Sequence, residues 1–413
     1  MLCIGAMSYG SPWDAAFRTK VFDASLKTFQ IFRSDDLLAR PIFMLDEGQG
    51  VTIEFDELAE EYTDFAYRVI HCDANWVKSS ISSLEYISGV DELPIDEFEY
   101  SSATNIDYCH YSLTIPNDQL TPRISGNYAV EIFRRDDPDE VVATACFMVV
   151  EPSASASLNA TTITDIGVNK QHQQLSAFVS YPKLKIGFPQ KELIIKVMQN
   201  WRTDTSVELQ RPYSISSNGV TYQHDQSLLF EAGNEFRRFE ASSTRNQGNM
   251  GVYELQYHEP YMHVILYQDE TRAGKSYLYD EDQNGQYLVR TLDGDDERIN
   301  ADYQLVHFSL ESDRIPDGAL YLAGDLTNWL YNDQHIMEYN AEAHAYEKTM
   351  MLKQGLYNYQ YLFVPNGSTK GSPARSEGNH FEAENEYQIF VYYRPMGARY
   401  DRLIAFSNVS YKP

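Results

Sequence analysis

The sequence predicts an all-β protein built from consecutive β-sandwich domains. Short runs such as residues 51–55, 111–115 and 128–132 alternate apolar and polar side chains, a period of two that is typical of half-buried strands. Turn residues such as Gly126-Asn127 interrupt these runs. Aromatic residues make up 13% of the chain, with 31 Tyr and 20 Phe, and flat rings suit a pleated surface. No long stretch has helical periodicity, which favours tandem sandwiches of the immunoglobulin-like or early-set type.

Length and composition divide the chain into segments. A chain of 413 residues exceeds what one hydrophobic core usually serves, so we expect about two to four domains. Residues 152–157 (PSASAS) are too small to pack a core and predict one boundary, and the acidic run 293–297 predicts the next. The expected organisation is an N-terminal segment at 1–25, β-sandwiches at 26–152 and 153–292, and an early-set-like β-sandwich at 293–413.

The second of these sandwiches contains a strong turn signal. Residues 193–197 form an apolar run of strand length. Asn284-Gly285 separates residues 277–279 from residues 287–289, and a type I′ turn needs positive φ at both central positions, which Asn and Gly tolerate best. The two flanking runs are therefore predicted to form a β-hairpin.

The last sandwich contains a turn with a known counterpart. Residues 324–329 (GDLTNW) follow a predicted strand at 319–323 and precede alternating residues at 357–363. This arrangement resembles the early-set sandwiches that include the glycogen-binding modules of carbohydrate-active enzymes. In those modules additional exposed rings stack on sugar, whereas Trp329 is the only Trp in this segment. The resemblance implies a related fold, and we do not expect retained glycan binding.

The charge balance limits the partners. The formal net charge is −27 and the isoelectric point is near 4.7. A phosphate backbone would repel a chain this acidic that has no basic stripe, so we expect no nucleic-acid partner. No run approaches the ~18 to 20 apolar residues that a membrane helix needs, so we expect no direct membrane insertion.

The N-terminal residues have features of a processing signal. Residues 1–10 (MLCIGAMSYG) are small and apolar and end in an Ala-x-Ser pattern, like the tail of a secretory signal peptide. They lack a basic start and a full apolar core. Either this segment is a truncated signal peptide, or it is a plain N-terminal extension.

Three cysteines lie in the body of the chain, at Cys72, Cys109 and Cys146. This odd number without a Cys-x-x-Cys motif allows at most one disulfide. Cys109 is in phase with the apolar residues of the run 111–115, so we expect it to be a buried structural thiol.

His71-Cys72-Asp73 is the closest approach to a catalytic cluster in the sequence. Consecutive strand residues point to opposite faces, so His71 and Cys72 cannot easily pair as base and nucleophile. An enzyme would need a base from elsewhere, such as His110 beside Cys109. The simpler interpretation is a strand end closed by Asp73, and no catalytic residue and no cofactor is assigned.

Two acidic stretches resemble metal sites in part. Residues 280–285 begin like a calcium loop, but Thr291 occupies the twelfth position, where that loop needs a bidentate Glu. In residues 377–384, one His and two Glu at alternate positions would share one side of an extended chain. The same side chains could equally pair with Arg394 and Arg399, and no metal ligand is assigned.

Five segments share features with one protein family. In residues 377–403 an acidic lead-in with one His and one Phe precedes a strand, and an Arg-Pro-x-Gly-Ala-Arg-Tyr-Asp exit follows it. The other four segments are residues 67–76 (YRVIHCDANW), 147–151 (FMVVE), 233–236 (GNEF) and 301–310 (ADYQLVHFSL). Together they resemble the type IX secretion system plug proteins of Bacteroidota, a resemblance that extends from about residue 28 to residue 403.

This resemblance implies a function that needs no catalysis. Plug proteins are periplasmic subunits at the mouth of the giant outer-membrane barrel of type IX secretion, and they close its pore when no substrate is in transit. The chain is therefore expected in the periplasm, associated with the outer membrane through its partner, the translocon barrel. The alternative is a carbohydrate-binding β-sandwich protein, which would need an open aromatic platform.

Partner-binding surfaces usually combine aromatic anchors with polar rims. If the resemblance holds, we expect the partner to contact the loops around two Trp residues and the C-terminal motif. The predicted partner-binding residues are Trp76, Trp201, Phe381, Tyr393, Arg394 and Arg399.

Overall fold

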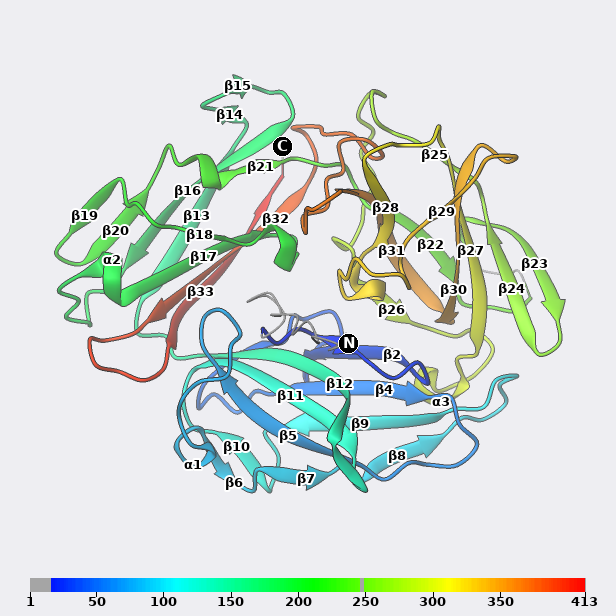
Figure 1. Ribbon diagram of the computed structural model, residues 1–413, viewed down its shortest axis with the longest axis horizontal. Coiled ribbons are helices and arrows are strands. Elements are labelled where there is room, and N and C mark those ends of the chain that lie inside the picture. Colours follow the sequence, from blue (N-terminus) through cyan, green and yellow to red (C-terminus); the bar gives the residue numbers. More distant parts are fainter. Residues whose placement is uncertain (1–15, 246–248, 413) are drawn as a thin grey trace, which may run out of the picture.

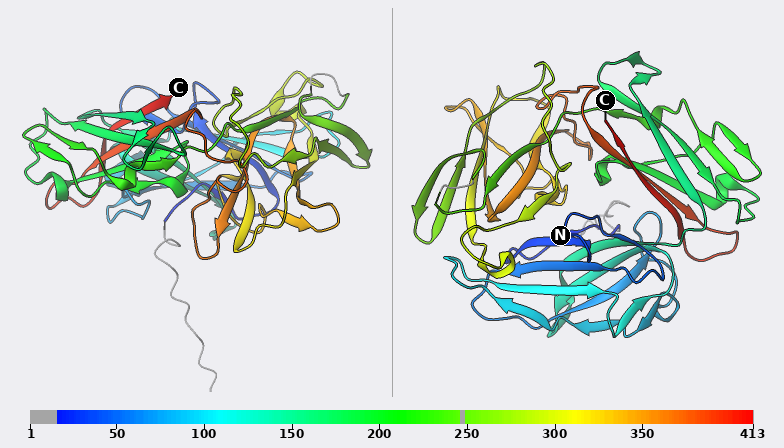
Figure 2. Two further views of the ribbon diagram at one scale, coloured as in Figure 1. Left: turned by 90° about the horizontal axis from the view of Figure 1, so that it is seen from above. Right: turned by 180° about the vertical axis from the view of Figure 1, so that it is seen from behind.

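The computed structural model describes residues 16–245 and 249–412, and these residues form three β-sandwich lobes (Figure 1). Lobe 1 comprises residues 16–152, lobe 2 comprises 153–232 together with 385–412, and lobe 3 comprises 233–384. The lobes lie at the corners of a triangle, and the view from above shows them side by side in one layer (Figure 2). The predicted all-β fold of tandem sandwiches is confirmed.

Lobe 1 is a sandwich of two sheets. Its elements are β1 (Lys20–Val21), β2 (Leu26–Arg33), β3 (Ile42–Met44), β4 (Val51–Glu57), β5 (Phe65–Cys72), α1 (Ser83–Tyr86), β6 (Ile87–Gly89), β7 (Glu92–Pro94), β8 (Glu97–Tyr100), β9 (Cys109–Ile115), β10 (Leu120–Pro122), β11 (Gly126–Arg134) and β12 (Asp137–Val150). One sheet has the order β1-β12-β11-β5-β7, with β3 parallel to β12, and the other has the order β2-β4-β9-β8. Val51, Ile53 and Phe55 are fully buried between the sheets, as their period of two predicts.

Lobe 2 is built from two distant parts of the chain. Its elements are β13 (Ser155–Thr161), β14 (Ile163–Thr164), β15 (Gly167–Val168), β16 (His172–Ser180), α2 (Pro189–Glu192), β17 (Leu193–Gln199), β18 (Val207–Glu208), β19 (Ser214–Ser216), β20 (Gly219–Tyr222), β21 (Leu229–Glu231), β32 (Asn385–Tyr393) and β33 (Arg402–Tyr411). One sheet has the order β13-β16-β20-β19, with β21 beside β16, and the other has the order β18-β17-β32-β33. In Figure 1 the two C-terminal strands, orange and red, therefore lie among green strands.

Lobe 3 is the third sandwich. Its elements are β22 (Arg237–Ala241), β23 (Val252–His258), β24 (Tyr261–Leu266), β25 (Asp269–Glu270), β26 (Tyr287–Val289), α3 (Glu297–Asn300), β27 (Tyr303–Glu311), β28 (Gly318–Ala323), β29 (Glu338–Asn340), β30 (Ala345–Lys353) and β31 (Gly355–Pro365). One sheet has the order β23-β24-β27-β30-β29, and in the other β31 pairs with β22, β26 and β28. None of the helices in residues 16–245 and 249–412 is long and apolar enough to cross a membrane.

The domain boundaries expected at 153–292 and 293–413 do not follow these sheets. Strand β17 pairs along its whole length with β32, from Leu193 opposite Tyr393 to Gln199. Lobe 3 is therefore inserted between two strands of lobe 2. Composition shows where a chain leaves a strand, but it does not show which distant strand completes the sheet.

The turn at Asn284-Gly285 is confirmed, but the hairpin predicted around it is wrong. The two residues have φ of +50° and +87°, as the turn requires. The preceding run is not a strand, however, and β26 pairs with β31 instead. A Cβ atom on Gly285 would lie 2.8 Å from ring carbons of both Phe236 and Trp329, so only glycine fits this close approach without rearrangement.

Candidate functional site

The lobes contact one another through three junctions, and most of the predicted partner-binding residues lie in these junctions. Trp76 and Trp201 belong to an apolar cluster between lobe 1 and lobe 2 that also contains Met148. The Trp201 ring centroid lies 5.7 Å from those of Phe390 and Phe406, two residues of the C-terminal hairpin. Both Trp side chains are thus partly buried at this junction, where they help to join the two lobes.

The Arg-Pro-x-Gly-Ala-Arg-Tyr-Asp exit forms the loop between β32 and β33, and this loop docks on lobe 1. Arg394 forms a two-pronged ion pair with Asp401, with Nε–Oδ1 at 2.6 Å and Nη2–Oδ2 at 2.9 Å. Asp401 is 1% exposed and accepts a further hydrogen bond, at 2.9 Å, from the backbone N–H of Ala74 in lobe 1. Arg399, on the surface of the loop, pairs with Glu85 of lobe 1. The loop therefore fastens the C-terminal hairpin to lobe 1.

The remaining two candidates occupy different settings. Tyr393 is buried in the core of lobe 2. Phe381 is partly exposed where the chain returns from lobe 3 to lobe 2, and its carbonyl accepts a hydrogen bond from Gln173 Nε2 at 3.0 Å. Among the six candidates, Arg399 has the most accessible setting, with a side chain that is 59% exposed.

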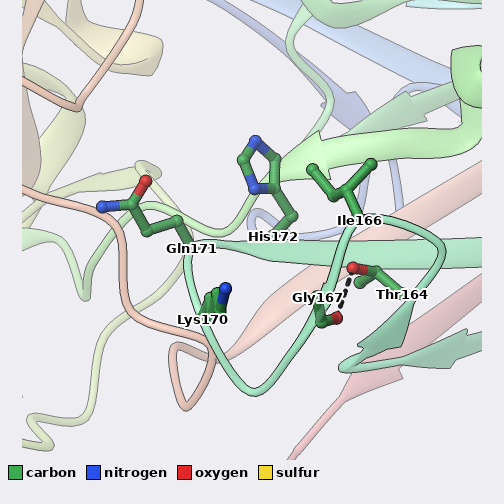
Figure 3. Close-up of a pocket in the computed structure, with 6 residues that line it drawn as sticks. All are labelled: Thr164, Ile166, Gly167, Lys170, Gln171 and His172. Atoms are coloured by element: carbon green, nitrogen blue, oxygen red, sulfur yellow. Dashed lines mark hydrogen bonds between the residues drawn. The ribbon is translucent and has the colours of Figure 1, made fainter.

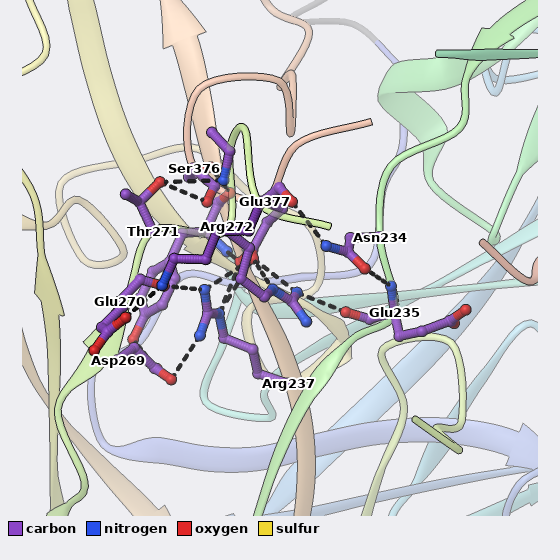
Figure 4. Close-up of polar contacts among 12 residues, drawn as sticks. Asn234, Glu235, Arg237, Asp269, Glu270, Thr271, Arg272, Ser376 and Glu377 are labelled. Carbon is purple, nitrogen blue, oxygen red and sulfur yellow. Dashed lines mark hydrogen bonds and ion pairs between the residues drawn. The ribbon is translucent and has the colours of Figure 1, made fainter. Parts of the chain in front are cut away.

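A buried ion-pair network fixes the two chain segments that cross between lobe 2 and lobe 3, residues 232–236 and 377–385 (Figure 4). The Glu377 side chain has no exposed surface and lies 3.0 Å from Arg237 and 2.7 Å from Arg272. Burial alone would raise the pKa of Glu377, but the two guanidinium groups outweigh it and hold that pKa below its usual value. The returning segment is thus held against lobe 3 by Arg237 at the start of β22 and by Arg272, two residues after β25.

These contacts differ from those considered from the sequence for residues 377–384. Pairing with Arg394 and Arg399 is wrong, because Arg394 bonds to Asp401 and Arg399 to Glu85. Glu377 pairs instead with two lobe 3 arginines that lie more than a hundred residues earlier in the chain, and Glu384 pairs with Lys412. Within the described part of the chain, no group of three or more His, Cys, Asp or Glu side chains is arranged to hold a metal ion.

Two other carboxyl groups at this crossing, those of Glu235 and Asp282, accept hydrogen bonds from uncharged donors. Glu235 is 2% exposed and accepts hydrogen bonds from the Tyr277 hydroxyl and from the N–H of Glu384, the latter at 3.1 Å. Asp282 accepts one from the N–H of Phe236 at 2.5 Å. Burial raises the pKa of Glu235 to about 7 and that of Asp282 to about 6. The crossing therefore contains carboxyl groups that titrate near neutral pH.

A buried charged cluster joins lobe 1 to lobe 3. Asp56 of lobe 1 has no exposed surface and accepts hydrogen bonds from Lys353 Nζ at 2.7 Å and from the Tyr303 hydroxyl at 2.6 Å. Its other oxygen lies 2.7 Å from Nδ1 of His110. Burial alone would raise the pKa of Asp56, but Lys353 and His110 outweigh it, so the pKa lies below 3.8. Lys353 also donates to the carbonyl of Arg298 at 2.6 Å.

Residues 324–329 (GDLTNW) lie where all three lobes meet. Trp329 is 8% exposed, and its indole N–H donates to Asp325 at 2.7 Å. The guanidinium of Arg202, from lobe 2, lies 5.5 Å from the centre of the Trp329 ring. Arg40, from lobe 1, forms a 2.5 Å ion pair with Asp325. The ring on which the comparison with sugar-binding modules depended is thus covered rather than open.

The cysteines and His71 are set in structural contacts. His71 Nδ1 lies 2.8 Å from the Ser79 hydroxyl, and burial lowers the pKa of this imidazole to about 4. Burial raises the pKa of Cys72 to about 12 and that of Cys109 to about 11, so both thiols stay neutral near pH 7. Cys72, Cys109 and Cys146 are free thiols, and the prediction that Cys109 is buried is confirmed.

One group of surface aromatic residues was not among the partner-binding residues predicted from the sequence. Tyr62, Phe98 and Tyr100 of lobe 1 are 52%, 36% and 48% exposed. The Tyr62 and Phe98 rings stack at 4.8 Å, and the Tyr100 ring meets Phe98 edge-on at 5.9 Å. The sequence held a signal in two acidic and aromatic stretches, 60–62 (EEY) and 96–100 (DEFEY). Nothing local shows that these stretches meet in space.

A surface pocket lies at the outer end of lobe 2, beside the β14–β15 hairpin (Figure 3). The Thr164 hydroxyl closes this hairpin with a 2.6 Å hydrogen bond to the carbonyl of Gly167. None of the predicted partner-binding residues lines the pocket. The lining residues are Thr164, Ile166, Gly167, Lys170, Gln171 and His172.

Comparison with known proteins identifies a matching family and a similar crystal structure. Residues 26–151 match the family described as "Type 9 secretion system plug protein 1st domain". The crystal structure of a hypothetical protein from Parabacteroides merdae is 42% identical, with a TM-score of 0.94, and the match covers 96% of this chain and 100% of that one. An enterococcal surface protein, partial N-terminal region, aligns over 99% of both chains at 9% identity, and its TM-score of 0.18 supports no structural argument. A search of curated proteins gave no match.

Proposed function

Because the chain belongs to the family of type IX secretion system plug proteins, we propose that it is a non-enzymatic accessory subunit of that system. In this proposal it binds the periplasmic end of the outer-membrane translocon barrel and seals the pore when the system is idle. It resides in the periplasm and is held at the outer membrane through the barrel. Its partner is therefore a protein, and its action depends on shape.

The observation that carries this proposal is the way in which the three lobes are locked together. Each pair of lobes shares a buried polar or apolar junction: Asp56–Lys353 between lobes 1 and 3, the Trp201 cluster between lobes 1 and 2, and the contact of Arg202 with the Trp329 ring between lobes 2 and 3. Breaking a buried ion pair costs several kcal/mol, so separate movement of a lobe is costly. A body that blocks a pore needs this rigidity.

The chemistry of the interior also supports a role without catalysis. A cysteine nucleophile needs a lowered pKa, whereas burial raises the pKa of Cys72 and Cys109. The imidazole of His110 is engaged with Asp56 in the lobe junction. These groups contribute to packing and to lobe contacts.

The proposal is tested by affinity purification of a tagged copy from its native outer membrane, followed by mass spectrometry. The same tagged copy in a strain that lacks the barrel serves as the control. Recovery of a very large outer-membrane barrel in stoichiometric amount supports the proposal. Recovery of the tagged protein alone would overturn it, and recovery with polysaccharide would favour the carbohydrate-binding alternative.

Sealing is tested separately from binding. We expect the purified chain to lower the ion conductance of the purified barrel in a planar lipid bilayer when it is added on the periplasmic side. An unrelated acidic β-sandwich protein of similar size is the control and should leave the conductance unchanged. Stable capture of the barrel without any fall in conductance would refute the sealing role.

A further inference from the structure

We propose that the free edge of β8 (Glu97–Tyr100) binds a basic, extended segment of the protein partner, which joins the sheet as an additional strand. The identity of that partner as the translocon rests on the proposed function. The segment would alternate apolar residues with Lys or Arg. Three features of β8 lead to this chemistry: its position in the sheet, the rings on one side and the carboxylates on the other.

The first feature is that β8 ends its sheet. It pairs with β9 on one side, and in the described part of the chain no strand lies on its other side, since the sheet order is β2-β4-β9-β8 (Figure 1). All its residues are exposed. An unpaired strand edge presents a row of backbone donors and acceptors, and proteins that use strand addition bind partners through such a row.

The second feature is the apolar side of β8. Phe98 lies opposite Tyr111 and Tyr100 opposite Cys109, and both of these β9 residues are fully buried. Phe98 and Tyr100 therefore continue the core side of the sheet, yet they remain 36% and 48% exposed. Tyr62 covers only part of this ring surface. A further strand would place its apolar side chains against these rings.

The third feature is the charge around the edge. Glu97 and Glu99 alternate with the rings and so point to the other side of the strand. Three further exposed carboxylates flank the rings in sequence, namely Glu60, Glu61 and Asp96. One cation reaches the group, because Arg298 of lobe 3 lies 3.6 Å from Glu99, with both side chains 50% exposed. Lys or Arg at alternate positions of an added strand would face Glu97 and Glu99.

The same charges argue against a second copy of this chain as the occupant. Pairing β8 with itself would bring Glu97 and Glu99 of one copy beside those of the other, and like charges across a strand pair are destabilising. A basic strand from another protein has the opposite preference. Electrostatic complementarity of this kind favours the correct partner and speeds association.

Site-specific photo-crosslinking in the native host tests the contact. A photo-reactive phenylalanine analogue replaces Phe98 or Tyr62, and in matched controls it replaces Tyr253 or Tyr213, which are 63% and 65% exposed on lobes 3 and 2. We expect crosslinks to the barrel from the two lobe 1 positions only. Crosslinks from the control positions alone would overturn the assignment of β8.

Charge reversal provides the second test and separates the two proposals. We expect Glu97→Lys with Glu99→Lys to reduce co-purified barrel roughly tenfold or more, since attraction at two pairs becomes repulsion. Glu254→Lys with Glu259→Lys, at exposed positions of lobe 3, should not. An unchanged thermal melting temperature checks that both variants fold. If the unaltered protein does not co-purify the barrel, the proposed function is refuted. If the barrel co-purifies equally with the unaltered protein and with both variants, only the β8 contact is refuted.

Discussion

Replacing Lys353 with Met tests whether the junction between lobe 1 and lobe 3 depends on its buried charge pair. The Lys353 and Asp56 side chains are 2% and 1% exposed, and their charged atoms lie 2.7 Å apart. Met nearly retains the length of the side chain and removes the ammonium. Asp56 then keeps His110 and Tyr303 as partners but loses the ammonium group of Lys353, which donates to it at 2.7 Å.

The expected cost follows from the burial of this pair. Removing one member of a buried ion pair typically costs 3–5 kcal/mol, because the remaining charge stays desolvated. Since Asp56 keeps two hydrogen-bonding partners, we expect the lower end, about 3 kcal/mol. This corresponds to a roughly 150-fold shift of the folding equilibrium. The destabilisation caused by Lys353→Met should also depend on pH. The pKa of Asp56 is depressed in the folded state, so its ion pair stabilises the protein above pH 3.8. This stabilisation disappears as the pH falls through the lower folded-state pKa.

Urea unfolding measures the free energy, and hydrogen–deuterium exchange in β4 and β27 reports opening at the junction. The matched control is Lys275→Met, which removes a surface lysine that is 50% exposed and paired with Glu270. An exposed pair of this kind contributes little to stability, because water screens both charges. In the double variant with Asp56→Asn, much of the loss should be recovered. If Lys353→Met is no more destabilising than Lys275→Met, the buried charge pair does not stabilise this junction.

Three further predictions address the lobe 2–lobe 3 crossing, the central turn and the C-terminal loop. A carboxyl group whose pKa is raised in the folded state stabilises the folded protein at pH values below its unfolded-state pKa. This contribution is lost as the pH rises through the folded-state pKa. Glu235→Gln should therefore remove a stability loss of up to about 3 kcal/mol between pH 4.5 and pH 7, measured by urea unfolding at several pH values; an unchanged slope would contradict this. Gly285→Ala should destabilise the protein by about 2 kcal/mol more than Gly274→Ala in thermal unfolding. Both glycines have positive φ, but only at Gly285 would the new Cβ lie 2.8 Å from ring carbons. Equal losses would show that the rings move aside without cost. Asp401→Asn should cost about 2 kcal/mol, because the Asp401 carboxylate is buried, whereas Arg399→Gln should have little effect, because water screens the exposed Arg399–Glu85 pair. The reverse order in urea unfolding would disprove the docking role of the loop.

Strands could be predicted from the sequence where their signal is local. The alternation of Val51, Ile53 and Phe55 records which side of the strand faces the core, and all three side chains are buried. The positive φ values of Asn284 and Gly285 follow from the identity of the two residues. The partner of the strand that follows this turn depends on tertiary packing, and there the local hairpin prediction was wrong.

The candidate site was harder to predict because a buried aromatic residue and an exposed anchor give the same sequence. Trp201 was selected for its ring, and the ring packs between lobes. Arg394 pairs with Asp401 seven positions away, a contact that a loop motif could suggest. Lys353 and Asp56 are separated by 297 positions, so no spacing rule relates them. Long-range pairs of this kind require the fold.

The five segments on which the family resemblance rests share a location in the structure. Each lies at or beside a lobe junction. Residues 67–76 and 147–151 contact lobe 2 from lobe 1, and residues 301–310 contact lobe 1 from lobe 3. Residues 233–236 lie where the chain enters lobe 3, and residues 377–403 span both the return to lobe 2 and the docking loop. What these segments encode is therefore the relative placement of three sandwiches.

Strand β8 lies outside all five segments. The two proposals therefore place shape and partner recognition in different parts of the chain, and this separation has a physical basis. A junction must bury charges and rings to be rigid, whereas a docking edge must leave backbone groups and side chains exposed to bind. Under the proposed function, loosening a junction should therefore impair closure of the pore while attachment to the barrel persists, and altering the β8 edge should impair attachment while the fold is kept.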